Sequence, residues 1–256
     1  MSMDLFTLEG RVAVVTGGNG GIGLGMARGL AMAGASIIVA ARDAHKNEAA
    51  VQELKALSVN AMAVETDVRR SDSCQSMFEA ATKSFGGVDI LVNNAGMNIR
   101  RQPQEYDLEA WNTVLETNLT SAMLCSKFAH PIMVKRGGGK IINIGSMMSI
   151  FGAPFASAYA ASKGGIVQFT KACASAWASD NIQVNAVLPG WIDTDLTRRG
   201  RKEVSGLHEK VLARTPAGRW GDPEDHAGVA IFLSGKGSDF VTGAAITVDG
   251  GFSIQA

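Results

Sequence analysis

Tyr159 and Lys163 are the residues of this chain whose types and spacing point most directly to chemistry. They lie four positions apart, so on a helix both side chains project from one face. A fixed ammonium beside a phenol favours the phenolate, and we expect it to lower the tyrosine pKa from about 10. Tyr159 would then exchange a proton near neutral pH. A tyrosine and a lysine at this spacing also occur together on solvated helix faces. The presence of Ser146, thirteen residues before Tyr159, favours a catalytic role instead.

A glycine-rich stretch follows an apolar run near the amino terminus. Residues 12–16 read as a strand, residues 17–23 are mostly glycine, and a helical run covers 24–33. This order is the context in which a dinucleotide-binding loop occurs, although a glycine-rich surface turn is the simpler alternative. Glycines let the backbone approach a pyrophosphate, whose charge a helix N-terminus favours. Two overlapping spacings fit: Gly18-x-Gly20-x-x-Gly23, and Thr16-Gly17-x-x-x-Gly21-Ile22-Gly23.

Together with motifs further along, these residues resemble the short-chain dehydrogenase/reductase family. The resemblance covers nearly the whole chain in the family's order and spacing, and several motifs at consistent separations are more specific than any one of them. The matching positions are Thr16 to Gly23, Asn93-Asn94-Ala95-Gly96, Asn118, Ser146, Tyr159, Lys163 and Pro189-Gly190.

The resemblance implies an oxidoreductase that interconverts a secondary alcohol and a ketone. Tyr159 would be its acid/base, Ser146 would hydrogen-bond the substrate oxygen, and Lys163 would lower the tyrosine pKa and hold the nicotinamide ribose. Asn118 would hold a water that links Lys163 to solvent. Asn118 also falls on the apolar stripe of an expected helix over residues 108–129, where a hydrogen-bonded core asparagine is the alternative interpretation.

The resemblance also implies a set of cofactor contacts at the glycine-rich loop and at the ends of later strands. Asp67-Val68 would contact the adenine, and Ile192 and Thr194 the nicotinamide carboxamide. The expected cofactor-binding residues are Gly17, Asn19, Gly21, Ile22, Gly23, Arg42, Asp67, Val68, Asn94, Ala95, Gly96, Tyr159, Lys163, Pro189, Gly190, Ile192 and Thr194.

The end of the second expected strand bears on which nicotinamide cofactor is used. An acid there accepts from the ribose 2′-hydroxyl of NAD, whereas an arginine accommodates the 2′-phosphate of NADP. Ala41 stands where the family's NAD-type acid usually lies, and Arg42 follows it. Asp43 could accept from a plain ribose or cap the next helix, and Arg42 could be a solvated charge. We expect NADP(H) in preference to NAD(H).

Strand-like and helical runs alternate along the chain. Several strand-like runs are continuously apolar, as occurs when helices cover both faces of a parallel sheet. We therefore expect an α/β, doubly wound, mainly seven-stranded parallel sheet of the Rossmann type, forming a single domain over residues 1–256. Residues 189–222 have no confident strand, and we expect a substrate loop or lid at about 190–215. The expected strands are Val12–Thr16, Ser36–Ala41, Ala61–Glu65, Ile90–Asn93, Lys140–Gly145, Gln183–Val187 and Ala245–Val248.

Composition excludes several other classes of function. The 24 basic and 24 acidic residues cancel, which leaves no electrostatic footprint for nucleic acid or an anionic membrane. No apolar run approaches the roughly 20 residues that span a bilayer, and residues 1–11 lack the apolar core of a signal peptide. The three scattered cysteines fit reduced thiols in a cytoplasmic protein. The four histidines lie far apart, so we expect no metal site.

Within the family, the chain looks most like bacterial sugar-acid dehydrogenases such as gluconate 5-dehydrogenase and the deoxygluconate dehydrogenases. Arg100 or Arg101 could pair with a substrate carboxylate, although paired arginines also occur as solvated loop charges. The other substrate candidates are Ser146, Met148 and Trp191. Met148 and Trp191 are apolar for a polyol acid, so two alternatives stay open: a 3-oxoacyl-carrier-protein reductase and a broad ketone or diketone reductase.

Two further expectations concern partners and a non-enzymatic role. We expect a homotetramer with a small-molecule substrate, because the helices that begin near Leu108 and Phe155 carry wide apolar stripes. The stripe on the second helix comprises Ile166, Phe169, Cys173 and Trp177. A dinucleotide-binding sensor is the alternative outside enzymes, but such relatives usually lose the tyrosine or the lysine, and both are present here.

Overall fold

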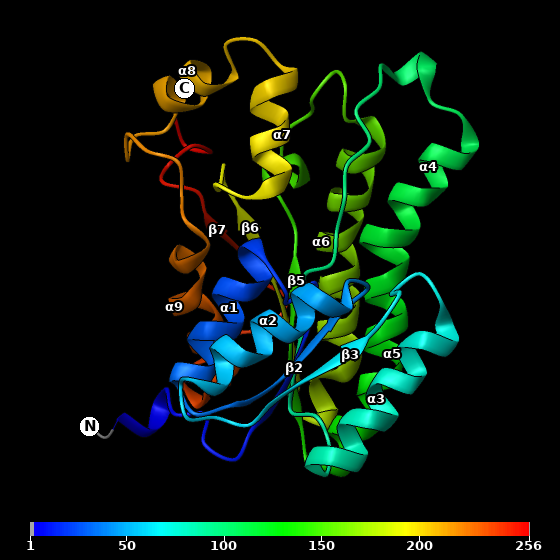
Figure 1. Ribbon diagram of the computed structural model, residues 1–256, viewed down its shortest axis with the longest axis vertical. Coiled ribbons are helices and arrows are strands. Elements are labelled where there is room, and N and C mark those ends of the chain that lie inside the picture. Colours follow the sequence, from blue (N-terminus) through cyan, green and yellow to red (C-terminus); the bar gives the residue numbers. More distant parts are fainter. Residues whose placement is uncertain (1–2, 256) are drawn as a thin grey trace.

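Seven parallel strands form one sheet in the order β3-β2-β1-β4-β5-β6-β7 (Figure 1). The structure is a computed structural model, and it describes residues 3–255. The predicted fold class is confirmed, and the observed strands differ from the predicted ones only at the ends of β5 and β6. The bounds are β1 Val12–Thr16, β2 Ser36–Ala41, β3 Ala61–Glu65, β4 Ile90–Asn93, β5 Gly139–Ile144, β6 Ile182–Pro189 and β7 Ala245–Val248.

Helices cover both faces of this sheet (Figure 1). The helices α1, α2 and α9 pack on one face, and α3, α5 and α6 pack on the other. Short 3-10 turns η1, η2, η4, η5, η6 and η7 occur between these elements. The helix bounds are α1 Gly21–Met32, α2 Ala44–Lys55, α3 Ser71–Phe85, α4 Leu108–Leu115, α5 Ser121–Lys135, α6 Ser157–Trp177, α7 Asp195–Glu203, α8 Leu207–Arg214 and α9 Ala227–Ser234.

Strand β1 shows why the central strands are apolar without alternation. Ala13 and Val15 belong to the core under α1, α2 and α9, whereas Val12 and Val14 belong to the core under α3, α5 and α6. Side chains alternate between the two faces of a strand, so a strand covered on both sides needs an apolar residue at every position. All five residues of β1 are accordingly buried.

The strand order places a crevice at the carboxyl ends of β1 and β4. The chain adds β2 and β3 on one side of β1, and then returns to add β4 and the later strands on the other side. Loops that leave β1 and β4 therefore diverge, and ligands of doubly wound sheets bind at such a reversal. The glycine-rich loop follows β1, and the Asn94–Gly96 turn follows β4, so both meet at this crevice.

One helical prediction needs correction. The expected helix over residues 108–129 is α4 and α5 joined by a π-helical turn, η3 (Glu116–Thr120), and it continues to Lys135. On the apolar stripe of α6, Ile166 and Cys173 are 1% and 7% exposed, whereas Phe169 and Trp177 are half-buried. Part of the stripe therefore packs inside this chain, and the homotetramer stays a prediction.

Residues 190–215 form two short helices, α7 and α8, rather than an irregular loop. In Figure 1 both project beyond the carboxyl ends of the strands, next to the crevice. A single bridge, between Ile192 and Gly221, ties the start of this segment to its return. The segment is thus positioned to cover the crevice.

Cys74, Cys125 and Cys173 are buried free thiols, and the Sγ atoms of Cys74 and Cys125 lie 3.8 Å apart between α3 and α5. Over residues 3–255, no helix has the length and apolarity needed to cross a membrane.

His226 is completely buried in the turn η6 (Pro223–His226). Burial lowers the imidazole pKa below 6.5. As pH falls below about 6.5, the unfolded chain takes up a proton that the folded chain does not, so the free energy of unfolding falls. We predict that wild-type protein loses more stability than His226→Phe between about pH 7.5 and pH 5.5, measured by urea denaturation.

His45 supplies the control, because His45→Phe removes a histidine that lies exposed at the surface. That variant should keep the wild-type pH dependence. Equal pH dependence in wild type and His226→Phe would contradict the prediction, whatever the absolute cost of the altered packing.

Candidate active site

A cavity of about 750 Å³ occupies the crevice at the carboxyl edge of the sheet. Its size is within the range of ligand pockets. Of the residues predicted to bind the cofactor, all except Gly23 line it, together with the predicted catalytic Ser146. The predicted residues in the lining are Gly17, Asn19, Gly21, Ile22, Arg42, Asp67, Val68, Asn94, Ala95, Gly96, Ser146, Tyr159, Lys163, Pro189, Gly190, Ile192 and Thr194.

The glycine-rich loop has the backbone that its sequence predicts. Gly17 and Gly21 have φ angles of +64° and +51°, which L side chains rarely adopt. Gly23 lies beneath the loop, where a Cβ atom would come 2.4 Å from both Asn94 Nδ2 and Gly17 O. Gly23 is therefore a packing glycine that brings α1 close to the loop. The bare backbone that results fits the pyrophosphate of a dinucleotide.

Thr16 and Asn94 fasten the two strand ends on either side of the crevice. Thr16 Oγ1 accepts from the backbone nitrogens of Asn94 and Ala95 at 3.0 and 3.1 Å. Asn94 Nδ2 in turn donates to the carbonyls of Thr16 and Gly17 at 3.0 and 3.1 Å. These bonds lock the β1 loop to the β4 turn.

Ser146, Tyr159 and Lys163 meet at one end of the cavity. Ser146 follows β5 and caps the turn η4 (Met147–Ser149), where its Oγ accepts from Met148 N at 3.1 Å. Tyr159 and Lys163 lie in the first turns of α6. Lys163 is 3% exposed; its Nζ donates to Ile144 O at 2.6 Å and lies 5.7 Å from the centre of the Tyr159 ring.

The Tyr159 pKa is raised, against the expectation that Lys163 lowers it. Burial raises the Tyr159 pKa, and this effect outweighs the lowering by the Ser146 hydroxyl and by the charge of Arg100. Burial also lowers the Lys163 pKa, to about 8, so this ammonium gives up its proton more readily than that of a solvated lysine. Near neutral pH the tyrosine is thus a protonated phenol, suited to donate a proton.

Asn118 lies on the π-helical turn, and its side chain is 2% exposed. Its Oδ1 accepts from Met97 N at 2.8 Å, while its Nδ2 donates to Met97 O at 2.9 Å and to Ser162 Oγ at 3.0 Å. The amide thus joins the segment after β4 to α6, which carries the catalytic pair. The water contact implied by the family resemblance stays a prediction.

The other substrate candidates do not line the cavity. Met148 and Trp191 pack in a small apolar cluster with Met147, Leu188 and Phe252. Trp191 Nε1 is buried there without a hydrogen-bond partner.

The two candidate arginines differ in their surroundings. Arg101 pairs with Asp107 at 2.6 Å, at the surface. Arg100 reaches α7, where it pairs with Glu203 at 2.5 Å and packs against Gly200. Only Arg100 therefore connects the segment after β4 with the helices over the crevice.

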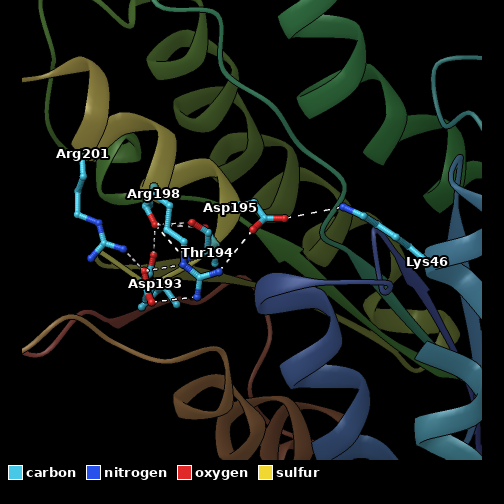
Figure 2. A network of polar contacts seen from close by, with 8 residues as sticks. Lys46, Asp193, Thr194, Asp195, Arg198 and Arg201 are labelled. Atoms are coloured by element: carbon cyan, nitrogen blue, oxygen red, sulfur yellow. Dashed lines mark hydrogen bonds and ion pairs between the residues drawn. The ribbon is translucent and has the colours of Figure 1, made fainter. Parts of the chain in front are cut away.

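A polar network fixes the beginning of α7 (Figure 2). Asp193 accepts from Arg198 at 3.0 Å and pairs with Arg201. Asp195 pairs with Lys46 of α2 at 3.8 Å, so one ion pair spans the mouth of the cavity. Both of its side chains are more than half exposed, and such pairs stabilise by at most about 1 kcal/mol.

The cavity is also lined by residues that the sequence analysis did not assign to the site, among them Lys46, Thr117, Leu196 and Thr197. Two of these four carried a usable signal. Lys46 lies in the first turn of α2, four positions after Arg42, which lines the same cavity. Thr197 stands three positions after Thr194, and the two residues form a capping box that begins α7.

The fold and this site define a dinucleotide-dependent oxidoreductase. The family described as enoyl-(acyl carrier protein) reductase matches residues 17–253. A 2-dehydro-3-deoxy-D-gluconate 5-dehydrogenase of Formosa agariphila is 41% identical over 252 residues, covering 98% of this chain and 96% of the relative. A 5-keto-D-gluconate 5-reductase of Escherichia coli is 39% identical over 251 residues, covering 98% of both chains.

The solved structures agree with these relatives. The crystal structure of a gluconate 5-dehydrogenase from Burkholderia cenocepacia, in complex with NADP and tartrate, matches with a TM-score of 0.93 at 36% identity and covers 99% of both chains. The chain belongs to the short-chain dehydrogenase/reductase family, and it is an NAD(P)-dependent alcohol dehydrogenase or carbonyl reductase.

The chemistry follows from the positions of three side chains. The nicotinamide supplies or accepts a hydride when bound. The Tyr159 phenol can supply the proton that a ketone oxygen needs on reduction, and its phenolate can accept the alcohol proton on oxidation. Ser146 presents a hydroxyl beside it that can hold the same oxygen, and Lys163 places an amine behind the phenol.

Tyr159→Phe should bind cofactor normally but lose hydride transfer, because the proton donor is gone while the nucleotide contacts remain. We predict a loss of at least about 10²-fold in kcat. Tyr106 is the other of the two tyrosines, and its hydroxyl bonds to Ile99 O outside the cavity. Tyr106→Phe is therefore the matched control and should stay active. Wild-type turnover by Tyr159→Phe would exclude the assignment.

Proposed function

We propose that this chain uses NADP(H) to interconvert a secondary hydroxyl and a ketone on a sugar acid of the gluconate type. The observation that carries the proposal is the meeting of Ser146, Tyr159 and Lys163 at one end of a dinucleotide-sized cavity. Two enzymes named for such acids are 41% and 39% identical to this chain over nearly its whole length. Turnover of a panel of sugar acids, β-ketoesters and diketones with NADPH and NADH tests it directly.

The preference for NADP(H) is supported by the charges at the far end of the cavity. Asp43, the acid that could accept from a plain ribose, is engaged as the N-cap of α2 and accepts from Lys46 N at 3.0 Å. Asp67 pairs with Arg69 at 2.7 Å. Arg42 is exposed, lines the cavity, and has no hydrogen bond or ion pair within residues 3–255. A guanidinium without a protein partner fits a phosphate.

Arg42→Ala should raise the KM for NADPH by about tenfold or more, and should change the KM for NADH little, because only NADPH loses a charge-assisted contact. Arg70 is the matched control: it pairs with Asp72 outside the cavity, and Arg70→Ala should leave both constants unchanged. Equal increases for the two cofactors would instead assign Arg42 a surface role.

Recognition of an acidic substrate is supported by Arg100 rather than Arg101. The Arg100 charge lowers the Tyr159 pKa, although burial raises it more. Its side chain is 21% exposed, and Glu203 on α7 holds it. A substrate carboxylate would take the place of Glu203 on this guanidinium. Arg101 is held away by Asp107.

We predict that Arg100→Ala lowers kcat/KM for gluconate-type acids about tenfold relative to matched uncharged alcohols. The measured quantity is the ratio of kcat/KM for the acid to kcat/KM for the uncharged alcohol. Arg100 also lowers the Tyr159 pKa, and this effect acts on both substrates and cancels in the ratio. Arg101→Ala should leave the ratio unchanged. If neither variant distinguishes charged from uncharged substrates, the sugar-acid assignment loses its support from the structure.

A broad ketone or diketone reductase is the second candidate, and the apolar cluster of Met148, Trp191 and Phe252 beside the cavity favours it. The third, a 3-oxoacyl-carrier-protein reductase, would need a basic patch for an acidic carrier. The basic run Arg198, Arg199, Arg201 and Lys202 on α7 is the candidate for that patch. Arg198 and Arg201 both pair with Asp193, which partly neutralises the run and weakens the docking interpretation.

The homotetramer remains a proposal, supported by exposed apolar side chains together with the half-buried part of the α6 stripe. Leu108 on α4 and Met123 on α5 are 78% and 40% exposed, and Phe240 before β7 is fully exposed. Assembly would cover these apolar side chains, which a monomer leaves in water.

A further inference from the structure

Asn47 is a polar residue on the buried stripe of α2. It is 1% exposed, and the other buried residues of that helix are Ala50, Val51 and Leu54. A buried amide is stable only when its donors and acceptor are paired. Asn47 meets this need with two bonds of 2.7 Å each, one to Ala41 O and one to the side chain of Asn19.

The chemistry of these two partners fixes the direction of both bonds. The Ala41 carbonyl can only accept, so the Asn47 NH₂ group faces it. The Asn47 Oδ1 is therefore left for Asn19, which must present its own NH₂ group. Asn19 lines the cavity, and its Oδ1 has no hydrogen-bond partner within residues 3–255. The chain of bonds thus fixes the orientation of the Asn19 amide and leaves its Oδ1 as an acceptor available to a ligand.

The same two bonds connect separate parts of the cofactor site. Asn19 belongs to the glycine-rich loop, whereas Ala41 is the last residue of β2 and directly precedes Arg42. Asn47 holds both from beneath, so it sets the distance between the loop and the strand end that carries the arginine.

We propose that Asn47 is a positioning residue for the adenosine end of the dinucleotide. It orients Asn19 so that the free Oδ1 accepts from a ribose hydroxyl, and it fixes the strand end from which Arg42 extends. The proposal rests on NAD(P) binding in this cavity and does not depend on the identity of the substrate.

Asn47→Leu tests it, because leucine has a similar size, stays compatible with the buried stripe, and makes neither bond. The probe is adenosine 2′,5′-bisphosphate, which contains the adenosine end alone, with binding measured by calorimetry. We expect its affinity and that of NADPH to fall about five- to tenfold, the value of one or two hydrogen bonds. At saturating NADPH, kcat should stay within about twofold, since the Tyr159 end is untouched.

Val51→Ala is the matched control. Val51 is 2% exposed on the same stripe, and its loss weakens the packing of α2 without touching either bond. This variant should melt at a lower temperature yet bind the bisphosphate as wild type does. A loss of affinity in Val51→Ala equal to that in Asn47→Leu would show that general loosening of α2 is the cause, and would overturn the proposal.

A second variant keeps the test decisive if Asn47→Leu does not fold. Asn19→Ala removes the acceptor at the cavity itself and should weaken the bisphosphate to a similar degree. In a foldable double variant the two losses should not add, because Asn47 acts partly through Asn19. Full additivity, or wild-type affinity in either single variant, would contradict the proposal. These measurements need no turnover, so they stand even if the sugar-acid assignment fails.

Discussion

The structure depends on the contact between the Asn94 amide and the two glycines around it. The amide nitrogen lies against Gly17 O, and a Cβ atom at Gly23 would collide with it at 2.4 Å. Nothing larger than glycine fits at Gly23. The missing side chain lets α1 start directly beneath the loop, with its N-terminus toward the crevice. The same amide holds the end of β4 level with the end of β1. The glycine-rich loop, the start of α1 and the end of β4 therefore all contact the side chain of Asn94.

Much of this could be predicted from the sequence because the information is local. Strand β1, which is covered on both faces, is a continuous apolar run, and the loop after it needs glycine at Gly17 and Gly21 for its positive φ angles. The Ser146, Tyr159 and Lys163 set needs only a strand end and one helix, so its spacing survives from sequence to structure. The same holds for the N-cap at Asp43, a bond between residues three positions apart.

The rest depends on contacts between distant segments and on burial. Arg100 finds Glu203 across more than a hundred positions, and no periodicity marks that pair. Burial decides the Tyr159 pKa, whereas spacing alone predicted the opposite direction. The stripe on α6 is buried at Ile166 and Cys173 but half-buried at Phe169 and Trp177, because a pattern of side chains does not say what covers each of them. Asn47 was visible as a polar residue among apolar ones, but its partners were not.

The π-helical turn at Glu116–Thr120 has a consequence for the direction in which the long helix faces. Residues of α4 pack against α6, whereas residues of α5 pack against α3 and the sheet. The turn accommodates an extra residue, which rotates everything after it by about 100° relative to a regular helix. One helical run can thus serve two different neighbours without a break in its axis. Removal of a single residue here would restore a regular helix, yet it would turn Cys125 and Met133 out of the core.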